Sequence, residues 1–122
     1  MNIIATVLAA LVIVEFVVIF VLETMRTTSQ KTADTFGIPV EELAKPHLNS
    51  ALKNQGVYNL CIAGLLVVGL VAGDTLLVAS TMVLIVIVAA YGSITVQPAI
   101  ILKQGALPIL ALIAMAATGA LF

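Results

Sequence analysis

The sequence predicts an all-α integral membrane protein, a four-transmembrane-helix antiparallel bundle with a short interfacial helix in its long first loop. The composition is the first reason: of 122 residues, 62% are hydrophobic and only 9% are charged, and the mean hydropathy is +1.25. The second is a set of four apolar stretches that approach the ~20 residues with which a helix crosses the hydrocarbon. Two of the three links between these stretches are tight turns, so consecutive helices are expected to be antiparallel neighbours.

The four expected helices belong to a single membrane domain, residues 1–122. Their approximate ranges are 3–24, 51–73, 75–97 and 99–122, and residues 25–50 form the long loop. Helices are favoured over strands because a spanning backbone must satisfy its own hydrogen bonds. The first stretch has no basic residue before it and contains Glu15, which favours a retained span over a cleaved signal peptide.

The later spans carry more interruptions than the first. The second is clean only over residues 60–73, so it reaches spanning length by including a polar start. The third, residues 75–96, holds no charge and is ended by Gln97-Pro98, because proline lacks a backbone donor. In the fourth, Pro108 is expected to free the Gln104 carbonyl and to kink the helix.

The long loop and the basic residues predict the orientation. Pro39 and the acidic residues after it indicate a short helix over residues 37–44, expected at the membrane surface with its apolar side chains partly inserted. All basic residues flank the first loop or the third link: Arg26, Lys31, Lys45, Lys53 and Lys103. Because basic loops stay in the cytoplasm, we expect a multi-pass protein of the plasma membrane with both termini extracytoplasmic and the long loop cytoplasmic.

Polar side chains of the expected spans gather in the cytoplasmic half. They form a candidate binding pocket made of Glu15, Glu23, Asn54, Gln55, Tyr58, Asn59, Tyr91, Thr95 and Gln104. Several are four residues apart and therefore share a helix face. Such a pocket would open to the cytoplasm. The alternative is that these groups only hydrogen-bond neighbouring helices or lie at the headgroup level.

The two acids of the first span differ in depth. Glu15 lies near mid-membrane, where an acid costs about 2.5 to 3.5 kcal/mol, so we expect it to face the bundle and to be protonated at rest unless a cation or several donors reach it. Such a group can exchange a proton for a cation, or it can simply be a neutral acid bonded to a neighbouring helix. Glu23, at the membrane boundary, is expected to stay hydrated or to form a salt link with Lys53 or Lys103.

Several classes of function and partner find no support. A net charge of −1 with five Lys and Arg residues gives no basic stripe, so nucleic acid is not an expected partner. His47 has no companion ligand, so no metal or cofactor is predicted. The phosphate loop, the nucleophile elbow and paired cysteines are absent. The expected partners are the lipid bilayer, a small-molecule or lipid ligand, and a second copy through the closely spaced Gly69 and Gly73.

One combination of residues points to a family. Glu15 and Glu23 are followed by Asn54-Gln55-Gly56-Val57-Tyr58-Asn59, Tyr91-Gly92 with Thr95, Gln104-Gly105 and Pro108. This pattern resembles the small four-helix bacterial membrane family catalogued as domain of unknown function 1304, over essentially the whole chain. The resemblance implies four helices and no assigned activity. Members often carry a histidine after the first acid, where this chain has Phe16.

Three hypotheses for function follow. The first is binding or transport of a small solute or lipid entering from the cytoplasm, with proton exchange at Glu15. The second is a membrane enzyme acting on a lipid or apolar substrate, with Glu15 or Glu23 as acid or base. The third is a structural or accessory membrane subunit, whose partner face would include Gly69 and Gly73.

Overall fold

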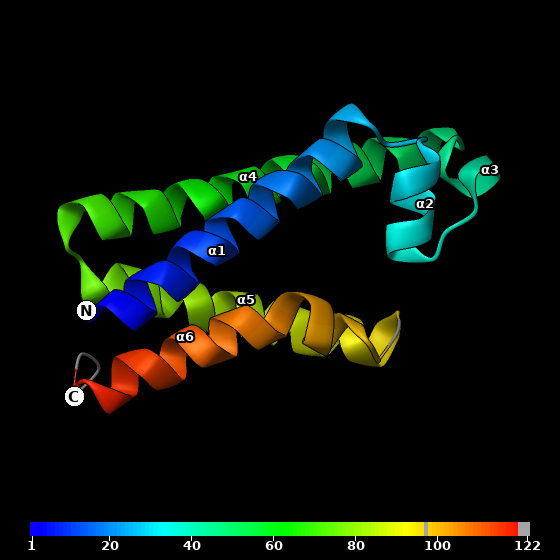
Figure 1. Cartoon of the computed structure of the whole chain (residues 1–122). Coiled ribbons are helices and arrows are strands. Elements are labelled where there is room, and N and C mark those ends of the chain that lie inside the picture. Colours follow the sequence, from blue (N-terminus) through cyan, green and yellow to red (C-terminus); the bar gives the residue numbers. More distant parts are fainter. Residues whose placement is uncertain (97, 120–122) are drawn as a thin grey trace. The chain divides into compact units, whose positions relative to one another are not determined.

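The computed structural model describes residues 1–96 and 98–119, so the expectations for Gln97 and for residues 120–122 lie outside it. The part it describes is helical throughout, without strands. The elements, in chain order, are α1 (Ile3–Phe20), a π-helical turn η1 (Val21–Met25), α2 (Gln30–Phe36), α3 (Val40–Leu43), α4 (Pro46–Ala72), α5 (Thr75–Thr95), a second π-helical turn η2 (Ile101–Gly105) and α6 (Ala106–Ala117), as Figure 1 shows.

Three helices are long and apolar enough to cross a membrane: Ile3–Met25, Pro46–Ala72 and Thr75–Thr95. The fourth apolar helix, Ile101–Ala117, is shorter. The second long helix begins at Pro46, ahead of the expected start at residue 51, because proline suits the first turn of a helix and the polar residues after it continue the helical backbone.

The chain forms two compact units. One is Val14–Ala63, and the other combines Met1–Ile13 with the described residues from Gly64 onward. The boundary falls inside α1 and inside α4, so each of these helices contributes to both units. We describe the units one at a time.

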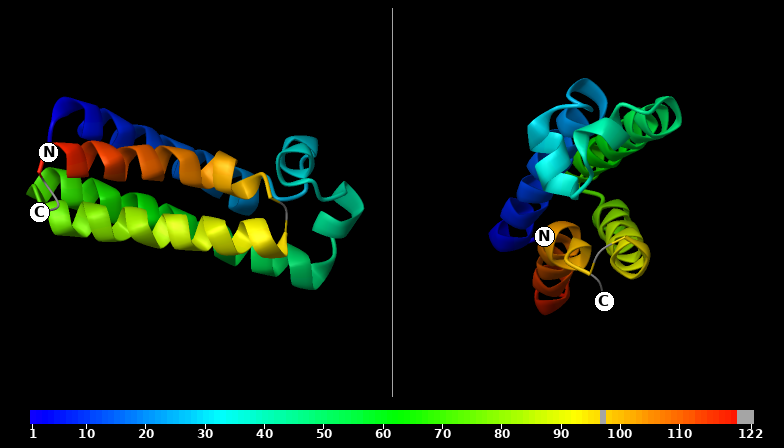
Figure 2. Two further views of the ribbon diagram at one scale, coloured as in Figure 1. Left: turned by 90° about the horizontal axis from the view of Figure 1, so that it is seen from below. Right: turned by 90° about the vertical axis from the view of Figure 1, so that its right-hand side faces the viewer.

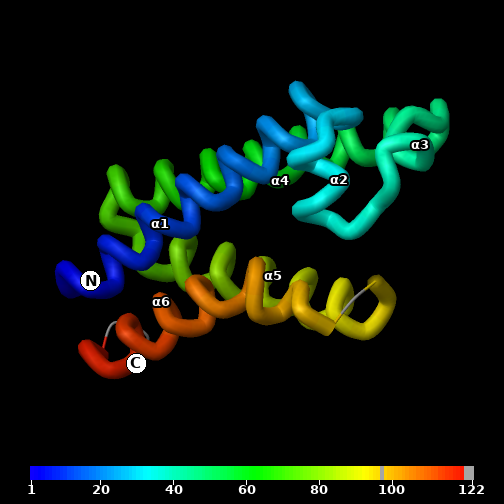
Figure 3. The backbone as a smooth tube through the Cα atoms, turned by 45° about the vertical axis from the view of Figure 1, so that its right-hand side comes forward, coloured from blue at the N-terminus to red at the C-terminus, as the bar shows by residue number. Residues whose placement is uncertain are grey.

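In the unit Val14–Ala63, the long loop is largely ordered (Figure 3). Ser29 caps α2 by accepting a hydrogen bond from the Thr32 N–H, and Gly37 ends this helix with a φ of +67°. We did not expect α2, because its sequence is polar. The expected interfacial helix corresponds to α3, in which Pro39 is the N-cap residue and not a residue of the first turn.

Apolar side chains of this loop pack on one another and on α4. Leu43 is 0% exposed and forms a small core with Ala33 and Leu52, against which Ile38 and Val40 pack. The expected insertion of Leu43 into the membrane is therefore wrong. Three short segments in succession can bury each other's apolar residues, and a buried side chain has no surface left to offer to lipid.

In the other unit, α5 packs against η2 and α6, which run back alongside it (Figure 2). The Ser93 hydroxyl fastens the connection: it accepts the Ile101 N–H at 2.7 Å and donates to the Ala89 carbonyl at 3.0 Å. A Cβ on Gly105 would lie 3.6 Å from the Cβ of Ala89, so this glycine lets η2 approach α5 closely. The π turn η2 directly precedes the helix containing Pro108, whose nitrogen cannot donate to the Gln104 carbonyl.

The link between α4 and α5 is a two-residue turn. Gly73 has a φ of +66°, which favours glycine, and the Asp74 carboxylate caps α5 by accepting the Leu77 N–H at 3.0 Å. The bound backbone of this turn places no demand on any other part of the chain.

Candidate functional site

The most distinctive polar feature of the unit Val14–Ala63 is a buried carboxyl group held by two amides. Glu23, in η1, is 1% exposed. Its Oε1 accepts a hydrogen bond from Asn59 Nδ2 at 2.6 Å, and its Oε2 accepts one from Gln55 Nε2 at 3.2 Å. Glu23, Gln55 and Asn59 are called the amide clasp below. It joins the end of the first long helix to α4.

The register of α4 builds the clasp. Gln55 and Asn59 are four residues apart, so they lie one above the other on the same face. Gly56 lies on the side of α4 that meets η1: a Cβ there would overlap Thr24 Oγ1 and lie 3.1 Å from the Glu23 Cβ. Thr24 Oγ1 in turn donates to the Lys53 carbonyl at 2.9 Å. The glycine therefore permits the close approach at which both amides reach the carboxyl group.

The backbone around Glu23 is also fully bonded. The π turn is closed by the Arg26 N–H, which donates to the Val21 carbonyl at 2.9 Å. Two buried hydroxyls satisfy carbonyls beside it: Thr27 donates to the Glu23 carbonyl at 2.6 Å, and Thr32 donates to the Leu22 carbonyl at 3.0 Å. Among the described residues, every buried side-chain nitrogen or oxygen has a hydrogen-bond partner.

The expected hydration or salt link of Glu23 is corrected by these contacts. The carboxyl group is buried, and its two described donors are neutral amides; Lys53, equally well described, makes no ion pair with it. The reason is that α4 directs Gln55 and Asn59 toward η1, whereas the Lys53 side chain is exposed. An ion pair does form elsewhere in the unit, between Lys45 Nζ and Glu42 Oε1 at 2.8 Å, where both side chains are exposed.

The other predicted site residues of this unit are more open. Glu15 is partly buried on α1, and within residues 1–96 and 98–119 no hydrogen bond reaches its carboxyl group. The adjacent Phe16 is buried. Asn54 is exposed, and Tyr58 is 72% exposed, so neither closes over the amide clasp. The structure thus joins three of the candidates and leaves Glu15 apart from them.

The remaining candidates belong to the other unit. Tyr91 is 60% exposed near the end of α5. The Thr95 hydroxyl donates to the Tyr91 carbonyl at 2.9 Å, which is a bond within its own helix. Gln104 is partly buried in η2. These contacts are local, so the shared pocket with Glu15 stays a prediction.

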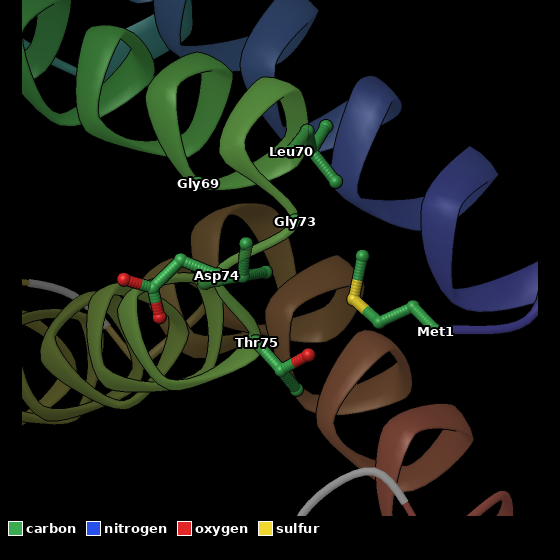
Figure 4. A pocket seen from close by; sticks show the side chains of 7 residues that line it. Met1, Gly69, Leu70, Gly73, Asp74 and Thr75 are labelled. Atoms are coloured by element: carbon green, nitrogen blue, oxygen red, sulfur yellow. The ribbon is translucent and has the colours of Figure 1, made fainter.

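A small cavity lies beside the turn between α4 and α5 (Figure 4). Its volume is about 120 Å³, below the range of roughly 300 to 1,000 Å³ that is typical of small-molecule sites. It is lined by Met1, Gly69, Leu70, Gly73, Asp74, Thr75 and Val78, none of which was a candidate for the polar pocket. A Cβ on Gly69 would lie 2.6 Å from Val78 Cγ2, so this glycine serves packing within its own chain. A homodimer through Gly69 and Gly73 stays a prediction.

Four residues that matter for the clasp escaped the sequence analysis as site residues: Thr24, Thr27, Thr32 and Gly56. Gly56 was visible as part of the quoted Asn-Gln-Gly stretch, and a glycine between two amides on one helix is a signal of close backbone approach. The threonines carried no such signal, because their role depends on carbonyls that the π turn leaves unpaired.

The fold and the clasp define a small all-helical protein with three helices long and apolar enough to cross a membrane, one of which carries a buried acid. This chain belongs to the family described as "Protein of unknown function (DUF1304)", whose model matches residues 10–116. It is 40% identical over 119 residues to the "Uncharacterized protein YpaA" of Lactococcus lactis subsp. lactis (strain IL1403), covering 93% of this chain and 97% of that protein. No solved structure matches the chain.

Proposed function

We propose that this protein crosses the plasma membrane four times and binds a small solute or lipid from the cytoplasmic side, with exchange of a proton at Glu15. The observation that carries the proposal is the amide clasp: a carboxyl group, 1% exposed, within a helix apolar enough to cross a membrane. Ionisable groups inside membrane helices are costly and are by default associated with the passage or binding of polar species.

The exposed side chains support the membrane. Large aliphatic residues face outward along the long helices, among them Val71 at 85% exposed and Ile94 at 86%. Of the most apolar window of Ile3–Met25, only 28% is buried. Apolar surface on this scale is uncommon on soluble monomers and suits lipid. The shorter helix Ile101–Ala117 would be the fourth span, assisted by local thinning of the bilayer.

Basic residues support the orientation. Four of the five lie in or beside the loop between the first two long helices, and Lys103 follows the third. By the positive-inside rule, this loop would be cytoplasmic and both termini extracytoplasmic. The amide clasp would then lie near the cytoplasmic end of its helices.

Glu15 is assigned the proton because of its contrast with Glu23. It lies eight residues earlier, about 12 Å along the helix at 1.5 Å per residue. The amide clasp occupies both oxygens of Glu23, whereas the Glu15 carboxyl has no hydrogen bond to a described residue and is only partly buried. A carboxyl group without a fixed partner is free to exchange its proton.

The test is difference infrared spectroscopy on protein reconstituted in vesicles, followed through a pH change. A carboxylic-acid band should titrate in the wild type and be lost in Glu15→Gln. The matched control is Glu41→Gln, which alters an exposed acid of α3 and should leave the band unchanged. If Glu15→Gln retained the whole titrating band while folded, proton exchange at this residue would be ruled out.

A structural role is the second candidate, and the complete bonding around Glu23 favours it. Every buried side-chain polar atom of the described chain is satisfied, which is also what a purely architectural junction requires. Under this alternative, variants of the amide clasp would lose stability, and no ligand would protect the wild type from unfolding. Stabilisation by a ligand would contradict the structural role, because a ligand stabilises only the state that binds it.

A further inference from the structure

The amide clasp is built only from groups that can present oxygen. Glu23 offers two carboxylate oxygens, and Gln55 and Asn59 each carry a carbonyl oxygen on the same planar group whose nitrogen now donates. A half-turn of an amide about its terminal bond exchanges nitrogen for oxygen without moving the rest of the side chain. The same three residues can therefore hold either a bare carboxylate, through N–H, or a cation, through C=O.

Charge limits what such a cation can be. Within the described chain, no three His, Cys, Asp or Glu side chains come together, so Glu23 is the only acid of the clasp. One positive charge neutralises it, whereas a divalent ion would leave an excess charge in an apolar region. Oxygen donors without sulfur or imidazole suit hard ions and not transition metals.

Space limits the cation further. Glu23 is 1% exposed, and a Cβ added at Gly56 would already overlap Thr24 Oγ1. An organic cation would need room that this close approach does not leave. A desolvated alkali ion requires little more than the space between three side chains, and the Gln55 side chain is exposed, so water can reach the remaining coordination positions.

We propose that the amide clasp is a binding site for a monovalent alkali cation of about the size of Na⁺, ligated by the Glu23 carboxylate and by the carbonyl oxygens of Gln55 and Asn59. The inference rests on the proposed function and names its solute. The cation competes with a proton for Glu23, because either one makes the buried group neutral.

The charged groups around the clasp leave this site to the cation. On α4 the Lys53 side chain is exposed, and Arg26, which follows η1, is exposed as well. On α2 both Lys31 and Asp34 are exposed. None of these described side chains forms an ion pair with Glu23. The remaining acid on α1 is Glu15, two turns deeper.

Equilibrium binding of ²²Na⁺ to the full chain in detergent tests the proposal, with choline chloride holding the ionic strength constant. Saturable binding is expected, weakened by acid and displaced by unlabelled Na⁺. Glu23→Gln should abolish it, and Asn59→Leu should weaken it about tenfold or more. Asn54→Ala, an exposed amide on the same helix, is the matched control and should bind as the wild type does.

Circular dichroism establishes which variants are folded, and Glu23→Asp serves if Glu23→Gln is not. Its shorter carboxylate should bind Na⁺ more weakly than Glu23 does. The site is disproved if the folded wild type shows no saturable binding of ²²Na⁺, or if folded variants of Glu23 bind it unchanged. Loss of the Glu15 infrared band without ²²Na⁺ binding would remove only the cation site, whereas ²²Na⁺ binding without that band would remove only proton exchange at Glu15.

Discussion

Gly56→Ala is expected to break the junction between η1 and α4. The added Cβ would overlap Thr24 Oγ1 and lie 3.1 Å from the Glu23 Cβ. Overpacking of this kind costs about 1 to 3 kcal/mol, and loss of the hydrogen bond from Thr24 to the Lys53 carbonyl adds about 1 kcal/mol. The greater helix propensity of alanine returns up to about 1 kcal/mol. The net loss of unfolding free energy is therefore about 1 to 3 kcal/mol.

Gly64→Ala is the matched control, because this glycine lies on the same helix and a Cβ there would have no neighbour within 4 Å. It reports the gain in propensity alone. Unfolding of both variants in mixed micelles, followed by circular dichroism, gives the two free energies. In a Thr24→Ala background the cost of Gly56→Ala should shrink, since the overlapping hydroxyl is gone. If Gly56→Ala proved as harmless as Gly64→Ala, the close approach would be wrong.

Three further predictions concern the clasp, the π turn and the lipid surface. Asn59→Ala should cost about 1.5 to 3 kcal/mol, because it removes the shorter of two hydrogen bonds to a buried carboxyl group, while Asn54→Ala should cost under about 0.5 kcal/mol in the same unfolding assay; equal costs would contradict the clasp. Thr32→Val keeps the side-chain shape but removes a hydroxyl that donates to two carbonyls, so it should cost about 1 to 3 kcal/mol, and a neutral result would refute that role. The chain has no tryptophan, so Ile94→Trp provides a single fluorophore that brominated lipid should quench more strongly than the one in Asp34→Trp; equal quenching would argue against lipid contact at Ile94.

The long helices could be predicted from the sequence because their apolar runs exceed what a soluble helix needs. The shorter elements were harder. α2 has a polar sequence, and its best signal was Ser29, a residue type that often caps helices. The start of α4 at Pro46 was missed because the analysis followed hydropathy, and the helix continues into residues that are not apolar.

The amide clasp was only half accessible from the sequence. Helical spacing placed Gln55 and Asn59 on one face, but it could not decide whether they meet Glu15 or Glu23. That choice depends on how closely two helices approach and on the π turn that presents Glu23, which are properties of packing between segments more than 30 residues apart. Spacing within one helix carries no information about such contacts.

The turn between α4 and α5 bears on how the chain enters the bilayer during synthesis. Its cap, its left-handed glycine and its hydrogen bonds all come from residues 69–78, so it can form as soon as the ribosome has released them. The two helices can then leave the translocon as one hairpin with no loop to export. Asp74, the acid at its tip, would cross the bilayer with its carboxylate already bound to the Leu77 amide.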